Sequence, residues 1–187
     1  MKISFVQIQN FRKLKNCKIN FGNKNTLFVG PNNSGKTSAM EAIVKMTKKN
    51  SINFNDITVS NHNMINEIGD LIIDKQSSLD EIELEWESLL PSIDIWIEVL
   101  NNEMQYVADL IPNLDWNGGL IGVRLILQPD KQEKIYNDYI EKYKKARDLE
   151  KKARENEKKI KIWPIDFCDY MKSKMNEKFK IKMYILD

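Results

Sequence analysis

The octapeptide at residues 30–37, GPNNSGKT, constrains the fold of this chain more than any other feature. It matches the pattern G-x-x-x-x-G-K-[ST] without interruption. The apolar run at residues 26–29 precedes it and predicts a strand buried on both faces. The segment that follows, residues 36–48, has apolar positions at helical spacing and predicts an amphipathic helix. A strand, a glycine-rich loop and a helix in this order are typical of a P-loop, whose backbone N–H groups surround phosphate oxygens at a helix N-terminus.

Each fixed position of this loop has a chemical reason. Gly30 and Gly35 allow backbone geometry and a close approach that a Cβ would obstruct. Lys36 is expected to bridge the β- and γ-phosphates and is the candidate catalytic residue, while Thr37 would give its hydroxyl to Mg²⁺. The predicted cofactors are therefore ATP and Mg²⁺. The other candidate nucleotide-binding residues of the loop are Asn32, Asn33, Ser34 and Ser38.

Elsewhere the spacing of apolar residues predicts an α/β chain. Strands are expected at residues 2–9, 17–21, 93–99, 121–127 and 179–185. Helices are expected at residues 104–111, at 130–162 as one long helix or a helix pair, and at 167–175. Residues 50–92 are rich in Asn, Ser and Asp and are expected to form a loop with short elements.

The scarce cysteines and histidine exclude several classes of protein. Cys17 and Cys168 have no CxxC partner, and His62 is the single histidine, so a disulfide framework, a zinc finger and a histidine metal site are not expected. The N-terminus is broken by polar residues where a signal peptide would be apolar, and no apolar run reaches membrane-spanning length. We expect a cytoplasmic protein with no membrane partner.

Charge is distributed unevenly along the 187 residues. The net charge is +2, but residues 1–130 carry 12 basic and 16 acidic residues, and residues 131–187 carry 17 and 11. Residues 131–161 could form a projecting arm for dimerisation or for contact with a DNA backbone, or simply a solvated helix stabilised by ion pairs. The lysines that would extend such a basic surface are Lys172, Lys174, Lys178, Lys180 and Lys182.

The residues around the loop also carry a family resemblance. The sequence NFR at residues 10–12, a strand ending in Phe21, and LFVGPNNSGKTS at residues 27–38 resemble the opening of the RecF- and SMC-type branch of ABC ATPases. Within that branch the chain most resembles the OLD (overcoming lysogenization defect) family and related bacterial AAA-type, ABC-like defence ATPases. The match covers about the first 48 residues, and the order of elements across residues 93–127 is similar as well.

The resemblance implies the N-terminal lobe of an ABC-type ATPase head, with an antiparallel β-subdomain and a long helical excursion. It divides the chain into a core lobe at residues 1–129, a charged helical arm at 130–162 and a returning helix and strand at 163–187. Such heads dimerise around ATP, and OLD-like members carry a Toprim nuclease domain or act with a separate effector subunit. By the same resemblance, Arg12 and, with less support, Lys13 would reach the nucleotide phosphates.

Several motifs of a complete ABC-type head are not evident. Such a head needs a Q-loop, a signature motif and an apolar strand that ends in Asp-Glu, because the Asp orders Mg²⁺ and the Glu positions the attacking water. Asp74 and Asp187 each follow an apolar run, but neither is followed by Glu. Gln128, at the end of an apolar strand, is a candidate for the Q-loop glutamine and hence for a Mg²⁺ ligand. We therefore expect the C-terminal half of the ATPase to lie outside this sequence, and hydrolysis by this chain alone is not expected.

These observations predict an ATP- and Mg²⁺-binding lobe that couples nucleotide binding and hydrolysis in the complete protein to homodimerisation and to DNA processing, DNA repair or antiviral (antiphage) defence. Two alternatives stay open. The chain could be a regulatory module that senses nucleotide without hydrolysing it and controls an effector nuclease, or a DNA-binding scaffold with a vestigial P-loop.

Overall fold

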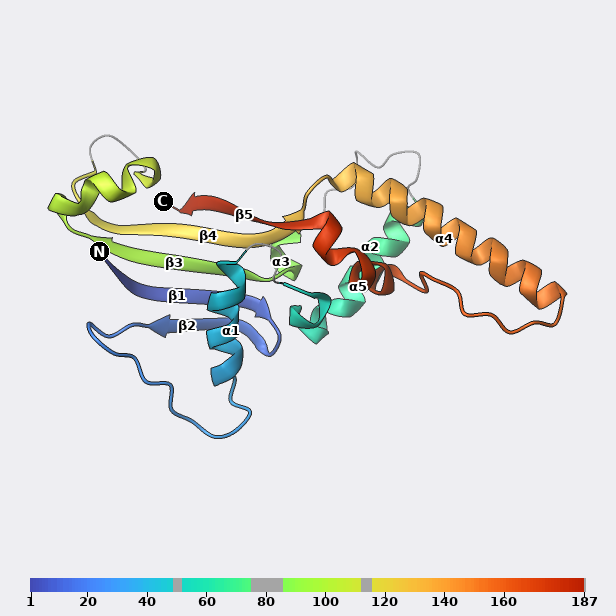
Figure 1. Ribbon diagram of the computed structural model, residues 1–187, viewed down its shortest axis with the longest axis horizontal. Helices are drawn as coiled ribbons and strands as arrows, with labels where there is room; N and C mark the ends of the chain where they lie inside the picture. The colour runs from blue at the N-terminus through green and yellow to red at the C-terminus, as the bar shows by residue number, and fades with distance from the viewer. Residues whose placement is uncertain (49–51, 75–85, 112–115, 187) are drawn as a thin grey trace.

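One five-stranded antiparallel sheet organises the molecule (Figure 1). The computed structural model describes residues 1–48, 52–74, 86–111 and 116–186. The strands lie in the order β2-β1-β3-β4-β5, so β2 and β5 form the edges. Their bounds are β1 Lys2–Phe11, β2 Leu14–Asn20, β3 Ser92–Val99, β4 Gly119–Pro129 and β5 Phe179–Leu186. These strands confirm the predicted ones, and the α/β fold class is confirmed with them.

The strand register places apolar side chains of three neighbouring strands on one face of the sheet. Val6 lies opposite Ile95, which lies opposite Val123, and side chains at alternate positions of a strand share one face. Helix α1 (Lys36–Met46) packs on β1 and β3 through its buried residues Ala39, Ala42 and Met46. It crosses the strands, as Figure 1 shows. The sheet thus supports the helix that begins at the P-loop.

Three longer helices pack together beyond one end of the sheet (Figure 1). They are α2 (His62–Asp74), α4 (Gln132–Glu155) and α5 (Phe167–Lys178), and we call them the helical lobe. The chain enters α4 from β4, returns along residues 156–166, and passes from α5 straight into β5. The short elements are η1 Phe54–Asp56, η2 Val59–Asn61, α3 Trp86–Leu89 and η4 Asn101–Leu110.

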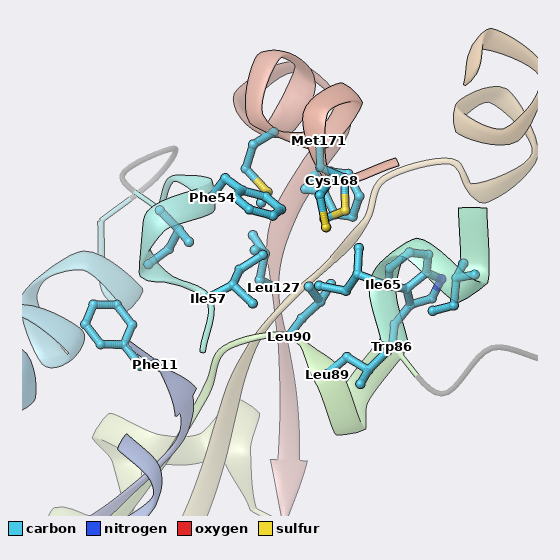
Figure 2. Close-up of a cluster of buried hydrophobic side chains, with 14 of the residues drawn as sticks. Phe11, Phe54, Ile57, Ile65, Trp86, Leu89, Leu90, Leu127, Cys168 and Met171 are labelled. Atoms are coloured by element: carbon cyan, nitrogen blue, oxygen red, sulfur yellow. The ribbon is translucent and has the colours of Figure 1, made fainter. Parts of the chain in front are cut away.

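A single apolar cluster connects the helical lobe to the sheet. Figure 2 shows Phe11 at the end of β1, Leu127 of β4, and Cys168 and Met171 of α5 around this cluster. Aromatic side chains dominate the part inside the lobe: the ring centroids of Tyr139 and Phe167 lie 4.7 Å apart in an edge-to-face arrangement.

The chain departs from the sequence predictions at residues 26–29, where the expected buried strand is wrong. These residues have no regular structure, and the side chains of Leu27 and Val29 are 86% and 81% exposed. A strand needs a neighbour for its backbone hydrogen bonds, and within the described residues no strand pairs with this segment. Phe28 alone packs against the core cluster.

Helix α2 is the main element that the sequence reading missed. The composition of residues 50–92 predicts a loop with short elements, and the apolar run at residues 71–73 resembles a strand that ends at Asp74. Instead this run is the last turn of α2, which buries Ile65, Ile68 and Ile72. That spacing is helical, so the signal was present but was obscured by the surrounding Asn residues.

Two predicted helices also differ in form. The helix expected at residues 104–111 is the 3₁₀ segment η4, which has a kink at Val107. The helix expected at residues 130–162 is one helix that ends at Glu155. Beyond it, the guanidinium of Arg147 donates to the carbonyl of Ile165 at 2.6 Å and fastens the returning segment against α4.

Candidate nucleotide-binding site

The P-loop turns directly into helix α1. Gly35 precedes the first helical residue, Lys36, and has a φ of +94°, a conformation that residues with a Cβ rarely adopt. A Cβ at this position would also lie 3.0 Å from the Leu14 side chain at the start of β2. Asn33, with φ +68°, is a second left-handed residue of the loop. The loop therefore depends on glycine for its backbone conformation and for its close approach to β2.

A cavity of about 340 Å³ lies over this loop. Its lining combines the loop and the start of α1 with the turn between β1 and β2. The lining residues are Arg12, Lys13, Asn32, Asn33, Gly35, Lys36, Thr37 and Ser38. Three cations and two hydroxyls therefore share one pocket at a helix N-terminus, which is a suitable environment for a polyphosphate.

Lys36 closes the loop on itself. Its Nζ donates to the carbonyl oxygens of Gly30 and Pro31, each at 2.6 Å, and to the Ser34 hydroxyl at 3.3 Å. An ammonium group has three donors. A phosphate would have to exchange with at least one of these three acceptors to receive a hydrogen bond from Lys36.

The turn between β1 and β2 brings two further cations to the pocket. Lys13 donates from Nζ to Asn33 Oδ1 at 2.6 Å, which joins this turn to the P-loop. Arg12 has a φ of +52° and donates from Nε to Asp56 Oδ1 at 2.9 Å, while its Nη2 pairs with Glu41 of α1. Partial burial alone would lower the pKa of Arg12, but the hydrogen bonds to Asp56 and Glu41 outweigh it and raise that pKa.

A family model described as AAA ATPase domain matches residues 1–186. The chain belongs to the AAA ATPase domain family. Membership indicates nucleotide binding and ATPase activity for this domain. No curated protein and no solved structure matches the chain significantly.

Two candidate metal-site residues of this AAA ATPase domain lie outside the pocket. Gln128 donates to Glu87 at 3.2 Å and accepts from the Tyr184 hydroxyl at 2.7 Å, so its amide is engaged at the end of β4. Asp74 is the exposed last residue of α2 and does not end a strand. Asp187 lies outside the described residues.

The donors in the pocket fit a magnesium ion of the P-loop kind. Such an ion is held by one protein hydroxyl together with phosphates and water, and it needs no cage of protein ligands. Thr37 and Ser38 supply hydroxyls at the wall of the cavity. Within the part of the chain that the structure describes, no group of three His, Cys, Asp or Glu side chains could hold a metal ion by itself.

The predicted basic surface is partly neutralised. Lys174 pairs with Glu177 at 2.6 Å and Lys180 pairs with Asp130 at 2.6 Å. Lys172 places its ammonium 5.4 Å from the centre of the Phe54 ring. These lysines therefore do not form one unpaired stripe. Among the described helices, none is both long enough and apolar enough to span a bilayer.

Sequence reasoning missed the two acidic residues that hold Arg12. Asp56 is buried, comes 44 positions after Arg12, and reaches it only because residues 53–58 fold against the end of β1. The one local signal is the pair Asn53 and Asp56, which form a capping box around η1. Glu41 occupies an ordinary helix position, and nothing in its sequence context distinguishes it.

Proposed function

We propose that this AAA ATPase domain binds Mg·ATP in the cavity over residues 30–38. The observation that carries the proposal is the convergence of Arg12, Lys13 and Lys36 on one cavity at the N-terminus of α1. Lys36 would contact the β- and γ-phosphates, Arg12 would add a planar guanidinium suited to phosphate oxygens, and Thr37 would hold Mg²⁺. The ion would neutralise phosphate charge when bound.

The resemblance of residues 10–38 to OLD-, RecF- and SMC-type ATPases supports a more specific role. We propose that the chain is the N-terminal lobe of such an ATPase head and that ATP draws two heads together. In the complete protein this closure would control DNA processing or antiphage defence, through a Toprim nuclease domain or an effector subunit. The division of the chain at residues 129 and 162 belongs to this proposal, and so does Gln128 as a Q-loop glutamine, although it lies outside the cavity over residues 30–38.

Thermal unfolding with and without Mg·ATP tests nucleotide binding directly. Ligand at about 100 times its Kd stabilises a protein by about 2.7 kcal/mol, which raises the Tm of a chain of this size by about 5–10 °C. We expect this rise in the wild type and in Lys24→Ala, which removes an exposed lysine outside the cavity. We expect none in Lys36→Ala. A rise of equal size in Lys36→Ala would reject the cavity as the binding site.

One observation favours a nucleotide sensor as the second candidate function. Among the described residues that line the cavity, none is a carboxylate that could position an attacking water. A sensor would bind Mg·ATP and release no phosphate. A phosphate-release assay at saturating ATP separates the two: turnover abolished by Lys36→Ala supports hydrolysis by this chain, and binding without turnover supports the sensor.

A further inference from the structure

Asp56 is a buried charged residue that contacts Arg12, one of the residues that line the cavity. Its side chain is 1% exposed and accepts three hydrogen bonds, from Arg12 Nε at 2.9 Å, Lys45 Nζ at 2.7 Å and the backbone N–H of Asn53 at 3.1 Å. A buried carboxylate is tolerated when it is paired in this way. The carboxylate therefore joins the β1–β2 turn to helix α1 and to η1.

The backbone around Asp56 fixes the same connection. The N–H of Arg12 donates to the carbonyl of Asp56 at 2.8 Å, and the N–H of Thr58 donates to the carbonyl of Asn10 at 3.1 Å. Phe11 and Ile57 form a bridge between these two hydrogen bonds. Arg12 is thus held through both its backbone and its side chain by one segment.

The second carboxylate on Arg12 has a different environment. Glu41 projects from α1, its side chain is 39% exposed, and it pairs with Arg12 Nη2. An exposed pair of this kind contributes little and can be exchanged at small cost, whereas removal of a buried partner leaves an uncompensated charge. The two carboxylates therefore have different parts in the placement of Arg12.

We propose that Asp56 is a positioning residue that holds Arg12 at the wall of the P-loop cavity, and that Glu41 stays ion-paired with Arg12 until a nucleotide phosphate replaces Glu41. This inference rests on the proposed function, because it assigns a role within the same phosphate site. Asp56 does not touch the nucleotide and acts through Arg12. Because Arg12 Nε is bonded to Asp56, its Nη2 pairs with the exposed Glu41, which a phosphate can replace.

The proposal predicts opposite effects for two substitutions that make the same change of charge. Asp56→Asn and Glu41→Gln each remove one negative charge bonded to Arg12. Charge alone would make both variants bind a polyphosphate more tightly. If Asp56 positions Arg12, Asp56→Asn weakens ATP binding in spite of this, whereas Glu41→Gln removes the competing anion and strengthens it.

The experiment is calorimetric titration of the full chain with Mg·ATP. A hydrogen bond to a charged group corresponds to about tenfold in Kd, so we expect Arg12→Ala and Asp56→Asn each to weaken ATP about tenfold. The double variant should be no weaker than Arg12→Ala alone, because Asp56 acts only through that residue. Glu41→Gln should tighten ATP about threefold, and this gain should vanish in the absence of Arg12.

Lys45→Gln provides the matched control. Lys45 shares the Asp56 carboxylate but does not line the cavity, so its removal disturbs the same buried group without removing a phosphate contact. We expect its ATP affinity to stay within about twofold of the wild type, whatever its stability. A purely structural role of Asp56 would instead weaken ATP binding in Lys45→Gln and Asp56→Asn alike.

The outcomes separate this inference from the proposed function. Failure of the wild type to bind ATP rejects both. If the wild type binds ATP and folded Asp56→Asn binds it equally or more tightly, only the role of Asp56 is overturned. The same holds if the affinity losses of Arg12→Ala and Asp56→Asn add up in the double variant. If Asp56→Asn does not fold, Glu41→Gln decides, because this exposed substitution leaves the hydrogen bonds of Asp56 intact. Tighter ATP binding by Glu41→Gln supports the replacement of Glu41 by phosphate, and unchanged or weaker binding overturns the proposal.

Discussion

In the helical lobe, Tyr139, Phe167 and Tyr170 are buried against one another, whereas in the loop at residues 22–35 most side chains are exposed. The loop is held by its own polar contacts, such as those from Lys36 to the Gly30 and Pro31 carbonyls. The lobe is held by apolar contacts between segments far apart in the sequence. We therefore expect stability and nucleotide binding to depend on different parts of the molecule.

This contrast has a physical origin. A phosphate site must keep N–H groups and cations available, so its residues cannot all be buried or satisfied by one another. A core gains stability from the removal of apolar area from water, which favours large side chains in close contact. Substitutions in the two regions should therefore move different measurements.

The strongest test of this separation is Phe167→Ala in the helical lobe. Phe167 is fully buried, and its ring contacts those of Tyr139 and Trp86. Loss of a buried Phe costs about 3–5 kcal/mol, a large part of the stability of an ordinary domain. Urea unfolding followed by tryptophan fluorescence measures the change. The exposed Leu149→Ala on α4 is the control, with a change within about 0.5 kcal/mol.

Nucleotide affinity measured on the same variant sharpens the comparison. We expect folded Phe167→Ala to bind Mg·ATP as the wild type does, because neither Phe167 nor the rings that it contacts, Tyr139 and Trp86, are among the described residues that line the cavity. A tenfold loss of affinity in folded protein would mean that the lobe and the loop are coupled.

Local patterns were sufficient for much of the sheet and for the loop. The alternation in residues 93–99 and 179–185 gave β3 and β5, and the motif at residues 30–37 gave the turn into α1. Each of these elements is specified by neighbours within a few positions. Sequence reasoning succeeds where the determining contacts are close along the chain.

The failures involve partners distant in the sequence. The apolar run at residues 26–29 looks like a buried strand, but burial requires neighbouring strands, and the residues themselves do not reveal whether those are present. The resemblance predicts that Arg12 reaches the phosphates, but it does not predict the bond from Arg12 to Asp56, which no local pattern connects to it. Only the fold brings these two residues together.

A second prediction concerns a polar contact inside the helical lobe. Asp138 of α4 accepts from the Tyr170 hydroxyl at 2.7 Å and pairs with Lys142. Burial alone would raise the pKa of Asp138, but the hydrogen bonds from Lys142 and Tyr170 outweigh it and lower that pKa. Because the folded pKa is the lower one, the folded state binds fewer protons than the unfolded state near this pKa. The contribution to stability is present above about pH 4 and is lost as the pH falls through the folded value.

Asp138→Asn should therefore cost about 1 kcal/mol at pH 7, and the difference from the wild type should be smaller at about pH 3. Urea unfolding at the two pH values measures it. Asp148→Asn removes one carboxylate at an exposed position on the same helix and is the matched control. A gap between wild type and Asp138→Asn that is equal at both pH values would contradict the assignment of this ion pair.

The smallest effect is expected on the loop side, at Leu27. Its side chain is 86% exposed, so Leu27→Ser should change the free energy of unfolding by no more than about 0.5 kcal/mol. The neighbouring Phe28 packs against the core cluster, and Phe28→Ser should cost more, about 1–2 kcal/mol. A buried central strand would reverse the expectation, because truncation of a buried Leu costs about 2–5 kcal/mol. Urea unfolding of the two variants thus decides whether this segment is the exposed loop of the structure or the buried strand that its apolar run predicts. A loss of more than about 2 kcal/mol in Leu27→Ser would place residues 26–29 inside a packed sheet.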